Sequence, residues 1–429
     1  MAQRRMLASH CGAARFAFSW GLARLKAQLD AGGGGRVAWN LYALRREWNA
    51  SKSTVAPWWP ENSKEAYASG LDGLSRALQA WSASRRGVRH GESPGFPRFR
   101  ARGRRDSCRF TTGAIRVEDE RHLTLPRIGR LHTHEATTTL SELLGQRQAR
   151  ILSATISREA HRWFVSFTCE VDRKVTMSTE YEDVVGVDLG VLRLATLSTG
   201  ELVLGAHSLK GSQRRLKRAQ RVVSRRQKGS ARRRRAVLRL SRAHARVAAV
   251  RRDHLHKLTT RMAKGHGRIV IEDLAVKNLM RNARGTIHEP GRNVRAKAGL
   301  NRAIGGAGWA ELRRLLTYKC TWHGSRLVVA PRFFASSKQC SGCGAVKDGL
   351  SLSERTYRCD ACGLVIDRDL NAAINLAQWA TAQEYVAGSA LETLNARGED
   401  VRPGSCRADL DEARTETVSE PAGLIGGPR

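Results

Sequence analysis

Three acidic residues lie where predicted elements of regular structure begin or end. Asp188 ends the apolar run VVGVD, Glu272 ends RIVIE, and Asp369 lies just before a helix predicted from AAINLAQWA. Residues at the carboxyl ends of neighbouring strands meet at one edge of a sheet, so we expect the three carboxylates to converge. Hard carboxylate oxygens suit Mg²⁺, and such a cluster would hold two ions roughly 4 Å apart.

Two magnesium ions at that spacing would hydrolyse a phosphodiester by in-line displacement. One ion lowers the pKa of an attacking water, and the other stabilises the leaving 3′-oxygen. The strand–strand–helix order of the acids is that of an RNase H-like sheet. Asp273 and Asp367 compete for the roles of Glu272 and Asp369, and we interpret both as supporting or surface acids. VGVDLG is also similar to the phosphate loops of actin-like ATPases, although the later Gly-rich adenosine motifs are missing.

Four cysteines have the spacing of a zinc ribbon. Two Cys-x-x-Cys pairs, separated by 15 residues, are formed by Cys340, Cys343, Cys359 and Cys362. Four thiolates around Zn²⁺ leave no open position, so the expected role of this single ion is structural. One Cys-x-x-Cys pair alone would also fit redox chemistry, but two pairs at this spacing favour zinc. Thiolates suit Mg²⁺ poorly, so the two metal sites should stay separate.

The chain has 75 Lys and Arg against 39 Asp and Glu, a net charge of +36 over 429 residues. Such an excess repels itself unless a polyanion neutralises it, so nucleic acid is the first partner to consider and a membrane surface is the rival. No apolar run approaches the roughly 18 residues of a membrane-spanning helix, and the N-terminus does not resemble a secretion signal. The other five cysteines are scattered, which suits a reducing compartment. We therefore expect a cytoplasmic, nucleoid-associated protein with no membrane partner.

Residues 210–264 contain 21 Lys and Arg and one acid, Asp253. A sparse apolar stripe predicts two long antiparallel helices, with QKGS at 227–230 as the turn between them. A solvated charged hairpin is the alternative, but so one-sided a charge favours contact with phosphates. The candidate nucleic-acid contacts are Arg214, Arg215, Arg218, Arg221, Arg225, Arg226, Lys228, Arg232, Arg233 and Arg235.

The remaining segments alternate between helical and strand-like patterns. We expect helices within 6–50, interrupted by the glycine run at 32–35, and at 64–86, followed by an antiparallel sheet or small barrel within 109–172. A strand meander is expected over 184–205, an irregular mobile loop over 281–308, and then a helix and a buried strand. From about 381 onward the chain carries nine acids against five arginines, and we expect a disordered tail.

Several motifs together resemble the TnpB family, transposon-encoded RNA-guided nucleases of OrfB type that are related to the type V CRISPR effectors. They are PRFRARGRRDSCRFTTG, VVGVDLG, QRVVSRRQKGS, VIEDLAVKNLM, FFASSKQCSGCG and YRCDACGLVIDRDLNAAINLA. The similarity extends over roughly residues 8–380, and its C-terminal half is highly specific. It implies an α/β multidomain fold in which Asp188, Glu272 and Asp369 are the metal-binding acids of a split, RuvC-like nuclease core.

The resemblance also implies the order of the domains. We expect a helical recognition region at 1–95, a wedge β-barrel at 96–180, and the first part of the nuclease core at 181–335, which carries the basic hairpin at 209–264. A zinc ribbon at 336–366, the last core helix at 367–380 and the tail at 381–429 follow. Family members begin with a strand ahead of the helix that here starts around His10, and MAQRRMLASHCG lacks it, so we expect an incomplete barrel.

The function implied by the resemblance is Mg²⁺-dependent cutting of DNA under the direction of a guide RNA. The guide would derive from the transposon end, and the target would be double-stranded DNA beside a short adjacent motif. Such cutting would support maintenance of the element, and we expect a monomer. Two alternatives stay open at this point: an RNA-guided DNA-binding protein that does not cut, and a DNA-joining transposase.

Overall fold

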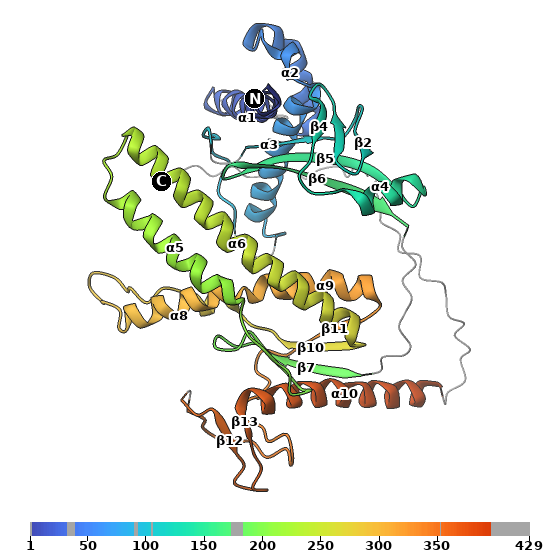
Figure 1. Cartoon of the computed structure of the whole chain (residues 1–429), viewed down its shortest axis with the longest axis vertical. Coiled ribbons are helices and arrows are strands. Elements are labelled where there is room, and N and C mark those ends of the chain that lie inside the picture. Colours follow the sequence, from blue (N-terminus) through green and yellow to red (C-terminus); the bar gives the residue numbers. More distant parts are fainter. Residues whose placement is uncertain are drawn as a thin grey trace.

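A computed structural model of the chain describes residues 2–31, 39–89, 93–103, 106–172, 183–351 and 353–395 (Figure 1). For residues 207–210 and 384–395 it describes the backbone alone. The N-terminal part is helical, as predicted. Its elements are α1 (Ala2–Asp30), α2 (Leu41–Val55), the short 3₁₀ helix η1 (Trp59–Glu61) and α3 (Lys64–Arg85). Helix α1 begins at Ala2 rather than around His10. The glycine run at 32–35 lies outside the described residues.

Small residues bring α1 and α3 into close contact. A Cβ added to Gly70 on α3 would lie 2.1 Å from the carbonyl oxygen of Ala14 on α1, so only glycine fits there. A Cβ added to Gly21 on α1 would lie 2.9 Å from the side-chain Cδ2 atom of Leu74 on α3, so the helices also approach closely there. The buried side chains of both helices continue into those of the following strands, which gives one hydrophobic core from Leu7 to Ile156.

The segment after α3 contains antiparallel strands, as predicted, together with a helix that was not predicted. In the described residues the strands form two separate three-stranded sheets, ordered β1-β5-β6 and β2-β3-β4, and not one continuous barrel sheet. The elements are β1 (Asp106–Phe110), β2 (Arg116–Asp119), β3 (His122–Leu125), β4 (Gly129–His132), α4 (Thr138–Gly145), β5 (Ala149–Glu159) and β6 (Arg162–Val171).

The C-terminal half is built on a five-stranded sheet in the order β11-β10-β7-β8-β9, which confirms the α/β prediction. Its strands β11, β10 and β7 are parallel to one another, whereas β8 and β9 form the predicted antiparallel meander after β7. The bounds are β7 (Val184–Asp188), β8 (Ala195–Leu197), β9 (Leu202–Val203), β10 (Arg268–Glu272) and β11 (Arg326–Ala330).

Helices cover both faces of this sheet, which explains why its strands are apolar on both sides. Ile269 and Ile271 point to the face covered by α6 (Ala231–Gly265) and α9 (Trp309–His323). Val270, between them, points to the opposite face and packs on α10 (Arg368–Asn395). Figure 1 shows α10 running along one side of the strands and α9 along the other.

The predicted basic hairpin is present. Helices α5 (His207–Ser224) and α6 pack side by side, and their junction lies at the predicted QKGS turn. Ser230 ends this turn and caps α6, because its hydroxyl accepts from the backbone N–H of Arg233. The prediction of an irregular loop at 281–308 is wrong over half of its length, since α8 (Val294–Ala307) forms there, preceded by the short α7 (Val276–Leu279).

Two further predictions, both for the C-terminal end, differ from the structure. The hairpin strands β12 (Thr356–Arg358) and β13 (Val365–Asp367) lead directly into α10, so Asp369 lies in the first turn of a helix and not before it. Helix α10 continues to Asn395, so the prediction of disorder from residue 381 is wrong for 381–395. The rest of that predicted tail, 396–429, lies outside the described residues.

Candidate active site

Asp188 and Glu272 are the last residues of two adjacent parallel strands. Val187 of β7 is in register with Ile271 of β10, so the acids that follow leave the sheet side by side at the same edge. Both strands are buried up to the acid, and each acid is half-buried. The apolar runs fix the strands in the core, and the strands end where the first charged side chain reaches the edge of that core.

Asp369 reaches the same edge because α10 lies almost on the backbone of β7. A Cβ added to Gly186 would lie 1.9 Å from the carbonyl oxygen of Ala373 and 2.7 Å from the backbone nitrogen of Ala377. The glycine in VVGVD therefore allows a helix–strand approach that no other residue allows. The start of α10, and Asp369 with it, is thereby brought against the end of β7.

The electrostatics of Asp188 show that the three acids lie close together. Burial raises the pKa of Asp188 to about 7, and the negative charges of Glu272 and Asp369 add to this rise. A divalent cation bound between these acids would stabilise the ionised form of Asp188, whose pKa is raised. The spacing of the three acids is wider than that of a single compact metal site, because their oxygens do not all lie within 4.8 Å of one another.

The two competing acids have other contacts. The Oδ1 atom of Asp367 accepts from the backbone N–H groups of Asp369 and Leu370, at 3.0 and 3.2 Å, so it caps α10. Its Oδ2 atom accepts from Arg193 at 2.9 Å. The same guanidinium lies 4.0 Å from Oδ2 of Asp369, so Arg193 lies beside both acids.

Asp273 is held away from the cluster by two arginines. Its oxygens accept from Arg313 of α9 at 2.6 Å and from Arg332 at 2.8 Å. These hydrogen bonds lower the pKa of Asp273, which is therefore ionised and paired. Asp273 and Asp367 thus each have hydrogen-bond partners of their own, and their interpretation as supporting acids stays a prediction.

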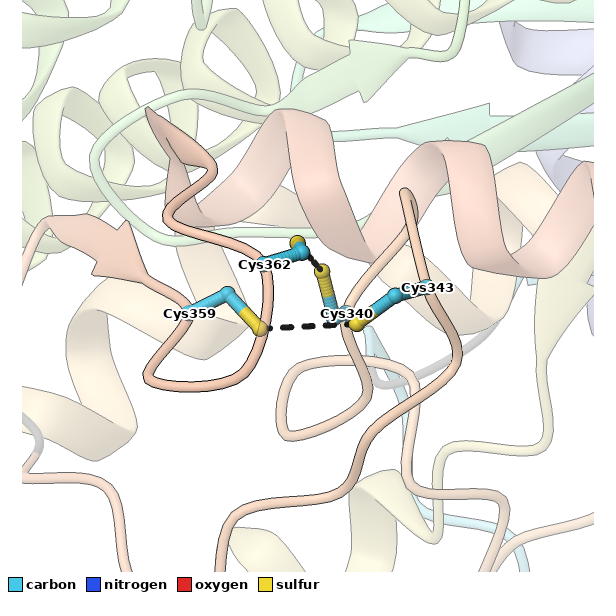
Figure 2. Close-up of side chains that lie close together, drawn as sticks. All are labelled: Cys340, Cys343, Cys359 and Cys362. Atoms are coloured by element: carbon cyan, nitrogen blue, oxygen red, sulfur yellow. Dashed lines mark hydrogen bonds between the residues drawn. The ribbon is translucent and has the colours of Figure 1, made fainter.

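The four predicted zinc ligands come together as a compact cluster (Figure 2). Their Sγ atoms all lie within 4.8 Å of one another, with 3.6 Å between Cys340 and Cys362 and 3.5 Å between Cys343 and Cys359. Four sulfurs placed about 2.3 Å from one zinc ion in a tetrahedron would lie about 3.8 Å apart. The cysteines therefore fit a single zinc ion.

Local structure explains how the cluster forms. Cys340 and Cys343 lie on a turn closed by the bridge between Gln339 and Val346, and the other pair lies on the turn between β12 and β13. The backbone N–H of Cys362 lowers the pKa of Cys359 to about 6, which favours the thiolate that zinc binds. Each pair thus sits at the tip of a short hairpin.

Replacing Cys340 with serine should remove the zinc. We expect about one equivalent per chain in the wild-type protein and close to none in Cys340→Ser, together with a lower melting temperature, because structural zinc contributes directly to folding. Metal analysis after dialysis and thermal melting would measure both quantities. Cys169→Ser is the control, since Cys169 lies on β6 outside the cluster. Zinc-free wild-type protein, or full zinc content in Cys340→Ser, would contradict the assignment.

The ten candidate nucleic-acid contacts line the hairpin. None of them pairs with an acid among the described residues, and nine are exposed. Arg233 differs, because its guanidinium donates to the carbonyl oxygens of Val223 and Arg226, at 2.6 and 2.9 Å, and so closes the turn between the helices. The other nine residues leave the surface of the hairpin positively charged, with no ion pair to an acid within the described residues. No described helix is long and apolar enough to span a membrane.

A second basic surface was not found from the sequence. A cavity of about 440 Å³ lies between α2, η1 and α3, and its lining combines four cations with aromatic rings and no acid. Its residues are Tyr42, Arg45, Arg46, Trp48, Asn49, Lys52, Trp59, Lys64, Tyr67, Ala68 and Leu71. Lys52 lies over the ring of Trp59, 4.2 Å from its centre. The signal in the sequence was the interleaving of Arg, Lys, Trp and Tyr in LYALRREWNASK, which is typical of surfaces that bind nucleic acid.

Comparisons with known proteins agree with this arrangement. The OrfB_IS605 family model, described as "Probable transposase", matches residues 166–283, and the model of the Cas12f1-like TNB domain matches residues 309–376. A Mycobacterium tuberculosis protein (strain H37Rv) named "Putative RNA-guided DNA endonuclease Rv2885c" is 42% identical over 98% of this chain and 92% of its own length. The similarly named InsQ of Escherichia coli K12 is 33% identical over 85% of this chain and 86% of its own length.

Among solved structures, a Cas12f1 chain in complex with sgRNA and target DNA aligns over 88% of this chain and 82% of its own, with 14% identity and a TM-score of 0.49. The sequence relatives are much closer. The match to the Mycobacterium tuberculosis protein covers the acid-bearing sheet, the basic hairpin and the cysteine ribbon together, since it extends over 98% of the chain. With 42% identity along almost its full length, the chain belongs to the TnpB (OrfB-type) family of RNA-guided DNA endonucleases.

Proposed function

We propose that this chain is an RNA-guided, Mg²⁺-dependent DNA endonuclease that acts for a transposon. The observation that carries the proposal is the convergence of Asp188, Glu272 and Asp369 at one edge of the five-stranded sheet in a member of this family. The strand order supports an RNase H-like, RuvC-type core, since the first three strands form an antiparallel meander and the next two join parallel to the first.

The three carboxylates would bind two Mg²⁺ ions through their oxygens, and these are the ligands that magnesium prefers. When bound, the ions would activate water and stabilise the charge that develops at the scissile phosphodiester. The chain's own residues position the carboxylates. Asp367 caps the first turn of α10, which carries Asp369. Arg313 and Arg332 bind Asp273 and so hold it away from Glu272.

Nucleic-acid partners follow from the charge. A guide RNA and double-stranded target DNA would lie along the nine exposed cations of the hairpin, and the aromatic and basic cavity between α2 and α3 would contribute in the recognition region. Base pairing would supply the sequence information, while the protein binds the sugar–phosphate backbone and reads a short adjacent motif. We propose the domain order expected from the sequence, with one structural zinc in the ribbon and a monomeric protein.

The experiment that tests this function starts from cells that carry the chain's native flanking DNA. The protein is purified, its bound RNA is sequenced, and a linear duplex with a guide-matched site is offered with Mg²⁺. We expect one enriched RNA species and cutting only of the matched duplex. A duplex with a scrambled site is the control. Specific binding without cutting would instead identify an RNA-guided DNA-binding protein, and absence of bound RNA would contradict the proposal.

Removing charge from the hairpin should weaken nucleic-acid binding and its dependence on salt. Replacing Arg214, Arg215 and Arg218 with glutamine should reduce the slope of log affinity against log salt by about 2 to 3, since each phosphate contact contributes about 0.7 to 0.9. Titration with the bound RNA at several salt concentrations measures this slope. The control replaces Lys257 and Arg261, which are already paired with Asp253 and Glu201. An unchanged slope in the triple variant would place the nucleic acid elsewhere.

A further inference from the structure

The segment between β11 and the first cysteine pair contacts the acid site directly. The hydroxyl of Ser336 donates to Oε1 of Glu272. Ser336 is buried, with an exposed fraction of 2%. Within the described residues this contact with Ser336 is the one hydrogen bond that the Glu272 carboxylate makes. Because Glu272 is the last residue of β10, the strand fixes its backbone but leaves its side-chain direction open. Ser336 therefore sets the direction of that carboxylate.

Two buried asparagines of α10 fix the same segment. The amide nitrogen of Asn375 donates to the carbonyl oxygens of Ser336 and Gln339, at 2.8 and 2.7 Å. The amide of Asn371 donates to the carbonyl oxygen of Gln339 at 2.7 Å and accepts from the backbone N–H of Ser341 at 2.9 Å. Asn371 and Asn375 are 0% and 1% exposed, so moving the segment would leave buried polar groups without partners.

The other end of the segment is part of the cysteine ribbon. The backbone N–H of Cys340 donates to the carbonyl oxygen of Ala345 at 2.8 Å, and the hydroxyl of Tyr357 donates to the carbonyl oxygen of Lys338 at 3.0 Å. A short stretch from Ser336 to Ser341 thus touches Glu272 at one end and carries a cysteine ligand at the other. The helix that holds this stretch in place also carries Asp369 in its first turn.

We infer that Ser336, Asn371 and Asn375 are positioning residues through which the cysteine ribbon sets the geometry of the acid site. When the ribbon is closed around its metal, the segment is held, Ser336 orients Glu272, and α10 begins where Asp369 faces Asp188. When the ribbon is open, the acids lose this alignment and bind a divalent cation more weakly. The inference rests on the proposed function, because it takes Glu272 and Asp369 as cation ligands.

Mn²⁺ binding followed by electron paramagnetic resonance tests the inference without using cutting as the readout. Ser336→Ala should weaken Mn²⁺ binding about 10-fold, the size expected for loss of one hydrogen bond to a charged group. Ser337→Ala is the matched control, since the side chain of this neighbouring serine makes no hydrogen bond within the described residues. RNA-guided DNA binding in buffer without added Mg²⁺ or Mn²⁺, and without chelator, should be the same in both variants, because the change lies in the acid site alone.

A second pair of measurements tests the link to the ribbon. Wild-type protein depleted of zinc, then freed of chelator, should bind Mn²⁺ at least as weakly as Ser336→Ala. Asn375→Ala should do the same while retaining zinc, which metal analysis would check. Equal Mn²⁺ binding by Ser336→Ala and Ser337→Ala, or full Mn²⁺ binding after zinc loss, would overturn the inference.

The two proposals can fail separately. A comparison with Glu272→Ala shows whether the wild-type protein binds Mn²⁺ through Glu272. If it does but leaves guide-matched DNA intact, the proposed function fails. The positioning inference is then still decided by the Ser336 variants. If the wild-type protein binds no more Mn²⁺ than Glu272→Ala, the positioning inference is overturned whatever the outcome of the cutting experiment.

Discussion

Asp188→Ala should lower the rate of guide-directed DNA cutting by at least about 1,000-fold while the bound RNA is retained. Metal ions at such a site contribute several kcal/mol to stabilisation of the transition state, and about 4 kcal/mol corresponds to that factor. Asp188 lies at the centre of the cluster, where the charges of both Glu272 and Asp369 act on it. Its loss therefore affects the binding of every ion that the three acids share.

The measurement is a single-turnover cutting time course with RNA-loaded protein in Mg²⁺. Asp253→Ala is the control, because Asp253 is an exposed acid of α6 that pairs only with Lys257 among the described residues. It should cut at the wild-type rate. Equal rates for Asp188→Ala and the wild-type protein would show that the chemistry does not take place at this sheet edge.

Gly186→Ala should destabilise the acid-bearing core strongly. The added Cβ would lie 1.9 Å from the carbonyl oxygen of Ala373, and this contact is with helix backbone, which cannot move without shifting α10. Overpacking of a close-packed core costs about 1–3 kcal/mol, and we expect the upper end of that range here. A loss of about 3 kcal/mol corresponds to a decrease of about 6 to 12 °C in melting temperature for a domain of this size.

Thermal melting of the purified protein would measure this decrease. Gly205→Ala is the matched control, because a Cβ at Gly205 would meet no atom within 4 Å and its backbone is not left-handed. Its melting temperature should change by less than about 2 °C, since surface substitutions usually shift stability by under about 0.5 kcal/mol. Failure of Gly186→Ala to accumulate as folded protein would agree with the prediction, whereas an unchanged melting temperature would contradict it.

The positions of the three acids and the cysteine cluster could be predicted from the sequence because their signals are local. RIVIE is an apolar strand that ends on an acid. Such a pattern places Glu272 at the edge of a sheet, independently of how the rest of the chain folds. Two Cys-x-x-Cys pairs at ribbon spacing predict one metal site, and the structure brings the four thiols together, with each pair at the tip of its own short hairpin. The basic hairpin was predictable for the same reason, since the QKGS turn interrupts an otherwise continuous helical pattern.

The other features depend on contacts between distant segments. The loop prediction for 281–308 followed the Gly, Arg and Asn content of the whole stretch, whereas VRAKAGLNRA within it contains good helix formers. Helix α8 forms there, and its buried Ile304 joins the core beside α6 and α9. The start of α10 was misplaced because Asp367, interpreted as a supporting acid, is also the residue that caps the helix. Ser336 meets Glu272 across 64 positions of sequence, and no local pattern marks that contact.

The position of α10 has a consequence for the order in which the protein is made. Chains fold from the N-terminus as they are synthesised, at about 5–20 residues per second. The hairpin is complete at Gly265, roughly a hundred residues before Asp369. A nascent chain can therefore present the basic hairpin several seconds before the third acid exists. On the proposed function, a chain released early would carry the positive charge of the hairpin without a complete acid site, so cutting of DNA would require translation of the last helix of the core.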